Sequence, residues 1–433
     1  MAWKDTSHPA GSPKIPARAF VYALLFIMMA INYVDRVNLS IAAGTIAKEL
    51  TLSPVQLGWL FSAFLWSYIV CLIPGGFLAD RFGFRYMPAV VVAFWSLATA
   101  STAAAYGLIA LLAARICLGA GEAGAWPSAT RAVRAWAPRS EYGLAISSIS
   151  LGQSFGVGFG ALLVGWLVRD FGWRASFVMT GALGAIWALV WLATVRGPGE
   201  AKWLGDGERR LILATRDERP VGDTGSGGYL GLIGSPAIWA LTLSQGCLVY
   251  AYYMLLTWLP NYLQTQRGIA IFGSGMYTAI IYGTAVVGSI LLARVTDRIF
   301  TIEALKAGAR RIAVVISFVP AMSMAATPWL TSTWLVVVVL TIAVTFLANA
   351  ISLNAVLCND LVRAPGDAGR AIALFTSGSN VIGVSAPIVT GYIVSSSQAF
   401  DAAFALTGAV LVLGAIILLV FARGGIGTKR ELP

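Results

Sequence analysis

The chain has 433 residues, of which 58% are apolar and 11% charged, and its formal net charge is +11. Its mean hydropathy is +0.78, whereas soluble domains carry roughly 45–50% apolar and 25% charged residues. A soluble enzyme, a secreted disulfide scaffold, a disordered tail protein and a nucleic-acid-binding protein are therefore excluded, and the lipid bilayer is the expected environment.

Twelve apolar stretches are long enough to cross about 30 Å of hydrocarbon as helices. In chain order they lie near residues 18–42, 54–78, 86–105, 108–130, 142–168, 174–195, 236–263, 274–296, 311–330, 333–358, 368–396 and 401–422. The one long polar break, residues 196–235, divides them six and six. We therefore expect an all-α membrane protein with twelve transmembrane helices in two six-helix bundles.

The domain boundaries follow from these spans. We expect a tail at 1–17, a first bundle at 18–195, a central loop at 196–235, a second bundle at 236–422 and a tail at 423–433. The first span lacks the short apolar region and small-residue cleavage site of a signal peptide, so it is expected to be retained. In the central loop, Asp206 is a plausible N-cap for a linker helix that is expected to be solvated, with a Leu/Ile face that could lie on the membrane surface.

Basic residues orient the chain. Lys48, Arg169, Arg174 and Arg267 are the basic residues in loops on one side, Arg36 and Arg115 lie within spans, and every other Lys and Arg lies on the side of the two termini. Because cytoplasmic loops are enriched in Lys and Arg, both termini are expected to be cytoplasmic.

The remaining reactive residues favour neither an enzyme nor a metal site. Cys71, Cys117, Cys247 and Cys358 sit in apolar runs without metal-binding or disulfide spacing, and the one histidine, His8, lies in the polar N-terminal tail. We expect no catalytic residue, no metal and no cofactor beyond a coupling proton.

Two short patterns recur in the two halves. Asp80-Arg81 at the end of the second span matches Asp297-Arg298 at the end of the eighth, and Gly152-Gln153-Ser154 in the fifth span matches Gly378-Ser379-Asn380 in the eleventh. Two halves of the same orientation predict a transporter whose binding site lies between them at mid-membrane depth.

These motifs carry a family resemblance. The string Gly76-Phe-Leu-Ala-Asp80-Arg81-Phe-Gly83-Phe-Arg85 resembles the loop signature of the major facilitator superfamily, and Asn32-Tyr33-Val-Asp35-Arg36 with the Arg115 to Glu122 pair resembles its anion:cation symporter family, which includes sugar-acid and sialin-like transporters. The resemblance implies that Gly76, Asp80, Arg81, Gly83, Arg85, Asp297 and Arg298 form a cytoplasmic gate motif. It also implies proton coupling at Asp35 and Glu122 and substrate binding at Arg36.

Four ionisable residues lie well inside the spans, Asp35, Arg36, Arg115 and Glu122, and such residues cost several kcal/mol to insert. At ~1.5 Å per residue, Arg115 lies at the depth of Asp35 and is expected to touch it as its charge partner. Glu122 lies nearer the centre among Gly and Ala, where burial favours its protonated form. Two alternatives stay open: the charges only lock two helices together, or Arg36 snorkels to the outer interface.

Several uncharged polar residues share this depth. Tyr33, Tyr68, Gln153, Ser352, Asn354 and Asn380 are expected to bind substrate hydroxyls, and Tyr250, Tyr252 and Tyr253 either gate the pocket or pack. A tryptophan that sugar-acid members tend to carry in the tenth span is absent here.

Together these observations predict a bacterial inner-membrane symporter that imports a small organic anion with protons by alternating access. A sugar acid such as galactonate, glucarate or a hexuronate is the first choice of substrate. An aromatic carboxylate symporter and a drug/proton antiporter of the same fold remain alternatives. The expected partners are a small carboxylate and the bilayer, with no nucleic acid, and the chain is expected to act as a monomer.

Overall fold

The computed structural model describes residues 16–216, 229–299, 308–363, 367–422 and 426, and this part of the chain is almost entirely helical. An isolated bridge joins Val362 to Ile426. The helices of the first half are α1 (Ala19–Glu49), α2 (Pro54–Thr102), α3 (Leu108–Glu122), α4 (Ala125–Trp136) and α5 (Tyr142–Thr194), with a short 3₁₀ turn at Arg139–Glu141. The helices that follow are α6 (Asp206–Thr215), α7 (Tyr229–Ile233), α8 (Pro236–Thr265), α9 (Ile271–Ile299), α11 (Ala309–Ala321), η2 (Met322–Trp329), α12 (Thr333–Leu361), α13 (Ala368–Gly383), α14 (Ser385–Ser397) and α15 (Asp401–Phe421).

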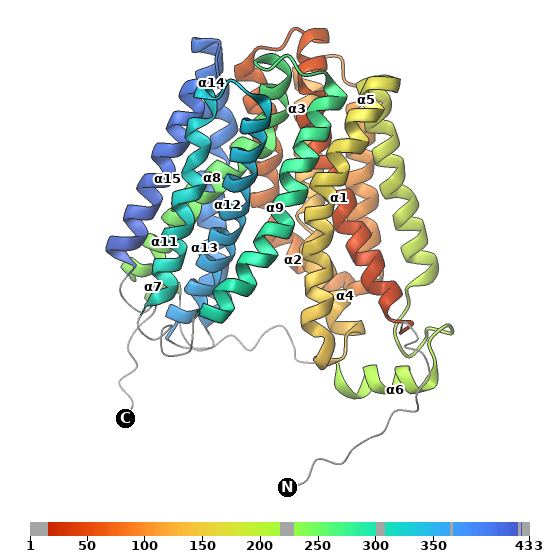
Figure 1. The fold of residues 1–433 in the computed structure, drawn as a ribbon. Helices are drawn as coiled ribbons and strands as arrows, with labels where there is room; N and C mark the ends of the chain where they lie inside the picture. Colours follow the sequence, from red (N-terminus) through yellow and green to blue (C-terminus); the bar gives the residue numbers. More distant parts are fainter. Residues whose placement is uncertain (1–15, 217–228, 300–307, 364–366, 423–425, 427–433) are drawn as a thin grey trace.

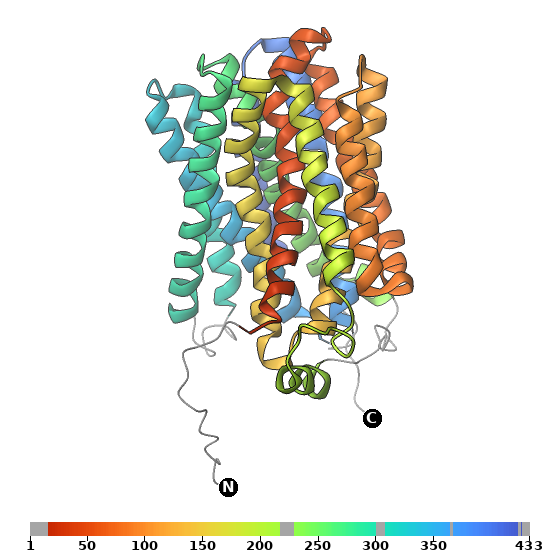
Figure 2. The ribbon, with the colours of Figure 1, turned by 90° about the vertical axis from the view of Figure 1, so that its right-hand side faces the viewer.

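Ten stretches of these described residues are long and apolar enough to cross a membrane, which agrees with the all-helical membrane fold expected from the sequence. The number falls below twelve because α2 and α5 each contain two predicted spans, joined through one glycine. Gly83 and Gly172 have φ of 69° and 82°, a region that only glycine adopts at little cost. Figure 2 shows the two arms of α2 lying side by side.

The helices gather into two groups, residues 19–194 and 236–421 (Figure 1). Within the first group α1 packs on α5 and α2 on α3, and within the second α8 packs on α13 and α15. The groups meet mainly through α5 against α9, α2 against α14 and α1 against α8. Helix α1 begins and α15 ends at the same end of the molecule.

The two groups are closed against each other at the opposite end. Ser40 Oγ donates to the carbonyl of Leu256 at 2.8 Å, and Ser62 Oγ donates to that of Val384 at 2.8 Å. A Cβ at Gly58 would lie 2.6 Å from the carbonyl oxygen of Pro387, so backbone meets backbone there. Figure 1 shows the ribbons of α9 and α5 diverging toward the end at which α1 begins.

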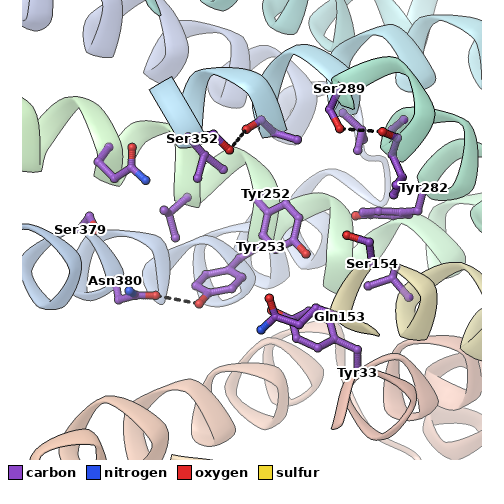
Figure 3. Close-up of a pocket in the computed structure, with 18 of the residues that line it drawn as sticks. Tyr33, Gln153, Ser154, Tyr252, Tyr253, Tyr282, Ser289, Ser352, Ser379 and Asn380 are labelled. Atoms are coloured by element: carbon purple, nitrogen blue, oxygen red, sulfur yellow. Dashed lines mark hydrogen bonds between the residues drawn. The ribbon is translucent and has the colours of Figure 1, made fainter. Parts of the chain in front are cut away.

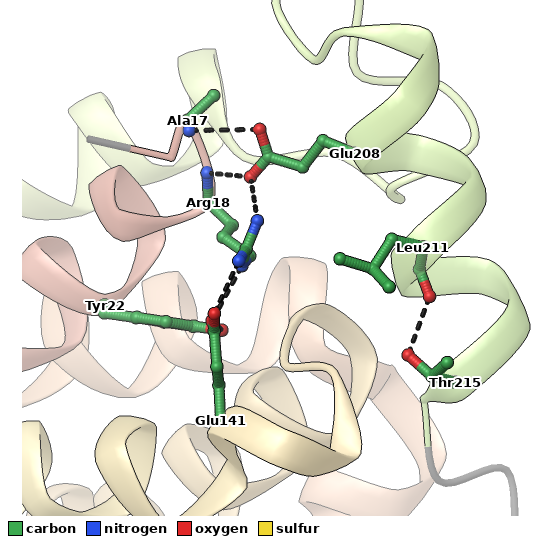
Figure 4. Close-up of polar contacts among 7 residues, drawn as sticks. All are labelled: Ala17, Arg18, Tyr22, Glu141, Glu208, Leu211 and Thr215. Carbon is green, nitrogen blue, oxygen red and sulfur yellow. Dashed lines mark hydrogen bonds and ion pairs between the residues drawn. The ribbon is translucent and has the colours of Figure 1, made fainter. Parts of the chain in front are cut away.

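Helix α6 of the central loop is docked on the first group. The Glu208 carboxylate accepts hydrogen bonds from the backbone N–H of Ala17 at 3.1 Å and of Arg18 at 2.8 Å, and pairs with the Arg18 guanidinium at 2.9 Å. Arg18 Nε also donates to Glu141 at 2.7 Å, so one arginine joins three segments (Figure 4). The expected linker helix is therefore present and largely exposed, but it is docked on one side through a shared cation that sequence alone did not reveal.

Aromatic stacking adds to this docking. The rings of Trp203 and Trp136 stack at a centroid distance of 5.2 Å and an interplanar angle of 2°, and Trp203 Nε1 donates to the Thr194 carbonyl at 3.1 Å. The predicted N-cap is also corrected: Gly205 occupies the cap position, and Asp206 is the first helical residue, paired with Arg209. On α6, Ile212 is buried, whereas Leu211 and Leu213 are exposed.

Replacing Arg18 with alanine is expected to destabilise the protein. The substitution leaves Glu141 and Glu208 without their shared cation, and losing hydrogen bonds to charged groups costs roughly 1.5–3 kcal/mol each. Thermal unfolding in detergent should show a lower midpoint for Arg18→Ala than for Arg210→Ala, whose side chain is exposed on α6. Equal midpoints for the two variants would show that the Arg18 contacts contribute nothing.

Candidate functional site

A buried ion pair joins the first group's α1 to α3. Arg36 Nε donates to Glu122 Oε2 at 2.8 Å, and the Glu122 side chain is fully buried while 10% of the Arg36 side chain is exposed. Glu122 Oε1 has no hydrogen-bond partner in the described part of the chain. The charge of Arg36 is therefore balanced by one oxygen of one carboxylate.

Three aromatic rings surround the Arg36 guanidinium. Its Cζ lies 4.6 Å from the ring centre of Tyr33, 4.9 Å from that of Phe64 and 5.0 Å from that of Tyr68. Arg115 lies 5.1 Å from the centre of the same Phe64 ring. Rings at these distances attract a cation through their electron-rich faces, so they hold the guanidinium in place without neutralising it.

The predicted contact between Asp35 and Arg115 is absent from this structure. No ion pair joins them among the described residues, and neither carboxylate oxygen of the buried Asp35 has a hydrogen-bond partner there. Thr99 and Thr180 lie close to Asp35. The prediction used depth alone, but successive helical residues point about 100° apart, so Arg36 faces Glu122 of α3 while Asp35 faces α2 and α5.

A cavity of about 390 Å³ lies between the two groups of helices. Figure 3 shows Tyr33 and Gln153 on its first-group wall and Ser352, Ser289 and Asn380 on the opposite wall. Small-molecule sites in proteins typically have volumes of about 300–1,000 Å³. The cavity is lined by Tyr33, Gln153, Ser154, Val157, Gln245, Val249, Tyr252, Tyr253, Tyr282, Ala285, Val286, Ser289, Val344, Ala348, Ile351, Ser352, Thr376, Ser379 and Asn380.

Four of the six uncharged residues expected to bind substrate line this cavity: Tyr33, Gln153, Ser352 and Asn380. Tyr68 and Asn354 do not line it. Tyr68 faces the Arg36 guanidinium instead, and the buried Asn354 donates to Gln245 Oε1 at 3.0 Å. Their contact with substrate hydroxyls stays a prediction.

Several polar lining residues of the second group were not predicted from the sequence: Gln245, Tyr282, Ser289, Thr376 and Ser379. Gln245 is an amide in an apolar span, the same signal that identified Gln153 and Asn380, and it was overlooked. Tyr282 is a buried tyrosine whose hydroxyl has no partner among the described residues, and a lone tyrosine in a span carries no distinguishing pattern. Of the tyrosines in α8, Tyr252 and Tyr253 line the cavity, whereas Tyr250 does not.

The residues of the expected gate motif lie at the end where the two groups diverge. Asp80 pairs with Arg131 of α4, and Arg85 lies 4.0 Å from Glu200. A Cβ at Gly76 would meet no atom within 4 Å, and Gly83 forms the bend of α2. Arg81 and Arg298 are exposed, while the side chain of Asp297 lies outside the described part. The gating role of these residues stays a prediction.

Comparisons with known proteins agree with this architecture. A family model described as Major Facilitator Superfamily matches residues 25–368. A probable galactarate/D-glucarate transporter of Bacillus subtilis (strain 168) is 30% identical over 416 residues, covering 93% of this chain and 90% of the relative. A probable sulfoacetate transporter of Cupriavidus necator is 30% identical over 94% of each chain. A D-galactonate transporter of Escherichia coli O6:H1 is 28% identical over 93% of this chain and 95% of the relative.

Two solved structures show a similar fold. A bacterial homolog of the human lysosomal transporter Spinster, inward-facing and unoccupied, superposes with a TM-score of 0.70 and 20% identity over 95% of this chain and 96% of that one. The xylose transporter of E. coli in its inward open conformation gives a TM-score of 0.71 and 15% identity over 96% and 98%.

Substitutions at Tyr68 test whether its ring or its hydroxyl matters. Because the ring faces the Arg36 guanidinium, Tyr68→Phe is expected to keep anion affinity, whereas Tyr68→Leu is expected to weaken it roughly 2–30-fold, the range of a cation–π contact of about 0.5–2 kcal/mol. Affinity is measured by binding of a labelled anion to purified protein. If the phenylalanine variant lost as much affinity as the leucine variant, the hydroxyl rather than the ring would be the contact.

Proposed function

Because the chain belongs to the major facilitator superfamily, whose members are transporters and not enzymes, we propose that it imports a small organic anion together with protons by alternating access. The multi-pass membrane fold and the cavity between two helix groups are the premises of this proposal. The observation that carries it is the Arg36–Glu122 pair. The arginine lies beside the cavity-lining Tyr33, and its partner is a carboxylate, a group that can take up a proton.

In this mechanism Glu122 and the substrate compete for Arg36. When Glu122 is ionised, it occupies the guanidinium. When Glu122 is protonated, its charge is lost and Arg36 is free to bind a carboxylate through the two parallel hydrogen bonds that a guanidinium offers. Glu122 Oε1, which has no partner among the described residues, is the atom on which that proton sits. Anion binding and proton uptake are thereby linked.

Asp35 is proposed as the second proton-carrying group. Its side chain is fully buried, and an isolated buried carboxylate is costly unless it is neutralised. Arg115, 3% exposed, lies within electrostatic range of both Asp35 and Glu122. We assign Arg115 the role of stabilising either carboxylate when it is ionised, without a direct ion pair in this conformation.

Alternating access requires that the cavity open to one side at a time. The two groups contact each other at the end away from the start of α1 and diverge at the other. The excess of Lys and Arg on the side of the termini supports a cytoplasmic location for that side. We therefore assign this structure to the inward-facing state of a monomeric transporter in a bacterial inner membrane.

A sugar acid is the first proposed substrate class. The galactarate/D-glucarate and D-galactonate transporters named above are relatives over nearly the whole chain. The cavity also offers many hydroxyl and amide groups for a polyhydroxylated substrate. The tyrosines Tyr33, Tyr252, Tyr253 and Tyr282 favour an aromatic carboxylate as the second candidate. The four buried charges sum to zero before substrate binds, which disfavours a cationic drug.

Replacing Glu122 with glutamine is expected to abolish accumulation driven by a pH gradient. Glutamine keeps the shape of the side chain but cannot release a proton, so exchange of substrate across the membrane should continue while uphill uptake is lost. Proteoliposome uptake with and without an imposed pH gradient measures both. Asp401→Asn, an exposed carboxylate in the first turn of α15, is the control. Gradient-driven accumulation at the wild-type level in Glu122→Gln would contradict this role of Glu122.

Replacing Arg36 with lysine is expected to weaken anion binding at least about tenfold, because a lysine keeps the charge but loses the planar, bidentate geometry. Direct binding to the purified protein measures the change. Arg169→Lys, in an exposed pair with Asp170, serves as the control for general effects of the substitution. Unchanged affinity in Arg36→Lys would remove Arg36 from the anion site.

A further inference from the structure

The cavity is uncharged outside the Arg36 region. Among its described lining residues none carries a charged side chain. Arg36 approaches it from the first group, through its contact with Tyr33 and its proximity to Tyr253. Arg115 lies on the same side, against Phe64, and does not line the cavity. The described cavity therefore has positive charge at one end only.

Three serine hydroxyls on the opposite wall already donate their protons to backbone carbonyls. Ser289 donates to the Val286 carbonyl at 2.9 Å, Ser352 to the Ala348 carbonyl at 2.9 Å and Ser379 to the Thr376 carbonyl at 2.9 Å. Each hydroxyl oxygen then keeps lone pairs that can accept a hydrogen bond. This wall (Ser289, Ser352 and Ser379) is therefore a set of acceptors.

The Asn380 amide beside this wall is partly committed: its oxygen and one of its two N–H groups are bonded. Tyr253 donates its hydroxyl to Asn380 Oδ1 at 2.7 Å, and Asn380 Nδ2 donates to the Thr376 carbonyl at 2.8 Å. Figure 3 shows Tyr253 between Asn380 and the Tyr33 side of the cavity, with Ser352 on the opposite wall. The serine oxygens suit the hydroxyl groups of a neutral tail. A second carboxylate would find neutral donors there, the Tyr282 hydroxyl and the Gln245 amide, but no cation among the described lining residues.

We propose that this site selects monocarboxylates over dicarboxylates of the same carbon skeleton. The single carboxylate binds Arg36, and the serine wall accepts hydrogen bonds from the hydroxyls of an uncharged tail. The inference rests on the proposed function. It separates this chain from relatives named for galactarate/D-glucarate, which are diacids, and places its substrate with monoacids of the galactonate kind. The physical basis of the selection is the free-energy cost of burying a second carboxylate without a cation to pair with it.

The test compares two matched pairs of acids on the purified full-length protein. D-Galactonate and galactarate share a polyol skeleton, and benzoate and terephthalate share a ring. Competition binding measures the affinity of each acid. In a pair whose monoacid binds, the affinity for the monoacid is expected to be at least tenfold higher than that for the matched diacid. A diacid that binds as tightly as its monoacid would overturn the inference. Binding of none of the four acids, or binding that survives Arg36→Ala, would overturn the proposed function and with it this inference.

A second cation on the serine wall should reverse the preference. Ser352→Lys places an ammonium group on the wall opposite Tyr33 and is expected to raise galactarate affinity relative to galactonate at least tenfold. Ser352→Gln, of similar length without charge, is expected to leave the ratio of the two affinities near the wild-type value. Ser289→Lys repeats the test from α9 if Ser352→Lys unfolds, as judged by thermal unfolding. An unchanged ratio in a folded lysine variant would contradict the assignment of this wall to the uncharged tail.

Discussion

The structure depends on one buried ion pair, Arg36 with Glu122. Two opposite charges buried in the protein stabilise each other only while both are present, and removing one partner of such a pair typically costs about 3–5 kcal/mol. The aromatic rings of Tyr33, Phe64 and Tyr68 hold the guanidinium in position while its partner changes. In the mechanism we propose, the pair is a two-state element: the cation keeps one place, and either Glu122 or the substrate carboxylate binds it.

The rest of the fold determines which side of the membrane can supply that external anion. Contacts between the two groups at the closed end use serine hydroxyls on backbone carbonyls and glycines against backbone. Larger side chains also meet between the groups: the Phe61 ring lies edge-on to that of Trp258 at a centroid distance of 5.3 Å, and Gln264 Nε2 donates to the Ile41 carbonyl at 3.1 Å. Two helix groups with a cavity between them suit the alternating access we propose, in which the molecule occupies two conformations of similar free energy.

Sequence patterns predicted which residues enter the membrane and at what depth, but not which way each faces. Apolar length predicted the spans, and the rarity of charge inside them singled out Asp35, Arg36, Arg115 and Glu122. Depth alone suggested the pairing of Asp35 with Arg115. The direction in which each side chain points also depends on how the helices are rotated against each other, and depth does not predict that rotation. The docking of α6 was also missed, because Arg18, Glu141 and Glu208 are brought together by tertiary structure across distant parts of the chain.

The buried charges and the neutral cavity wall belong to different halves of the chain. Asp35, Arg36, Arg115 and Glu122 all lie in α1 and α3, whereas most of the cavity lining comes from α8, α9, α12 and α13. If the four charged residues couple transport to protons, as we propose, mutations in the second half can reshape the cavity while those residues stay intact. The charged residues of the first half and the cavity lining of the second half can therefore change independently during evolution. Relatives of about 30% identity are named for acids as different as galactarate and sulfoacetate, which is a divergence that this separation permits.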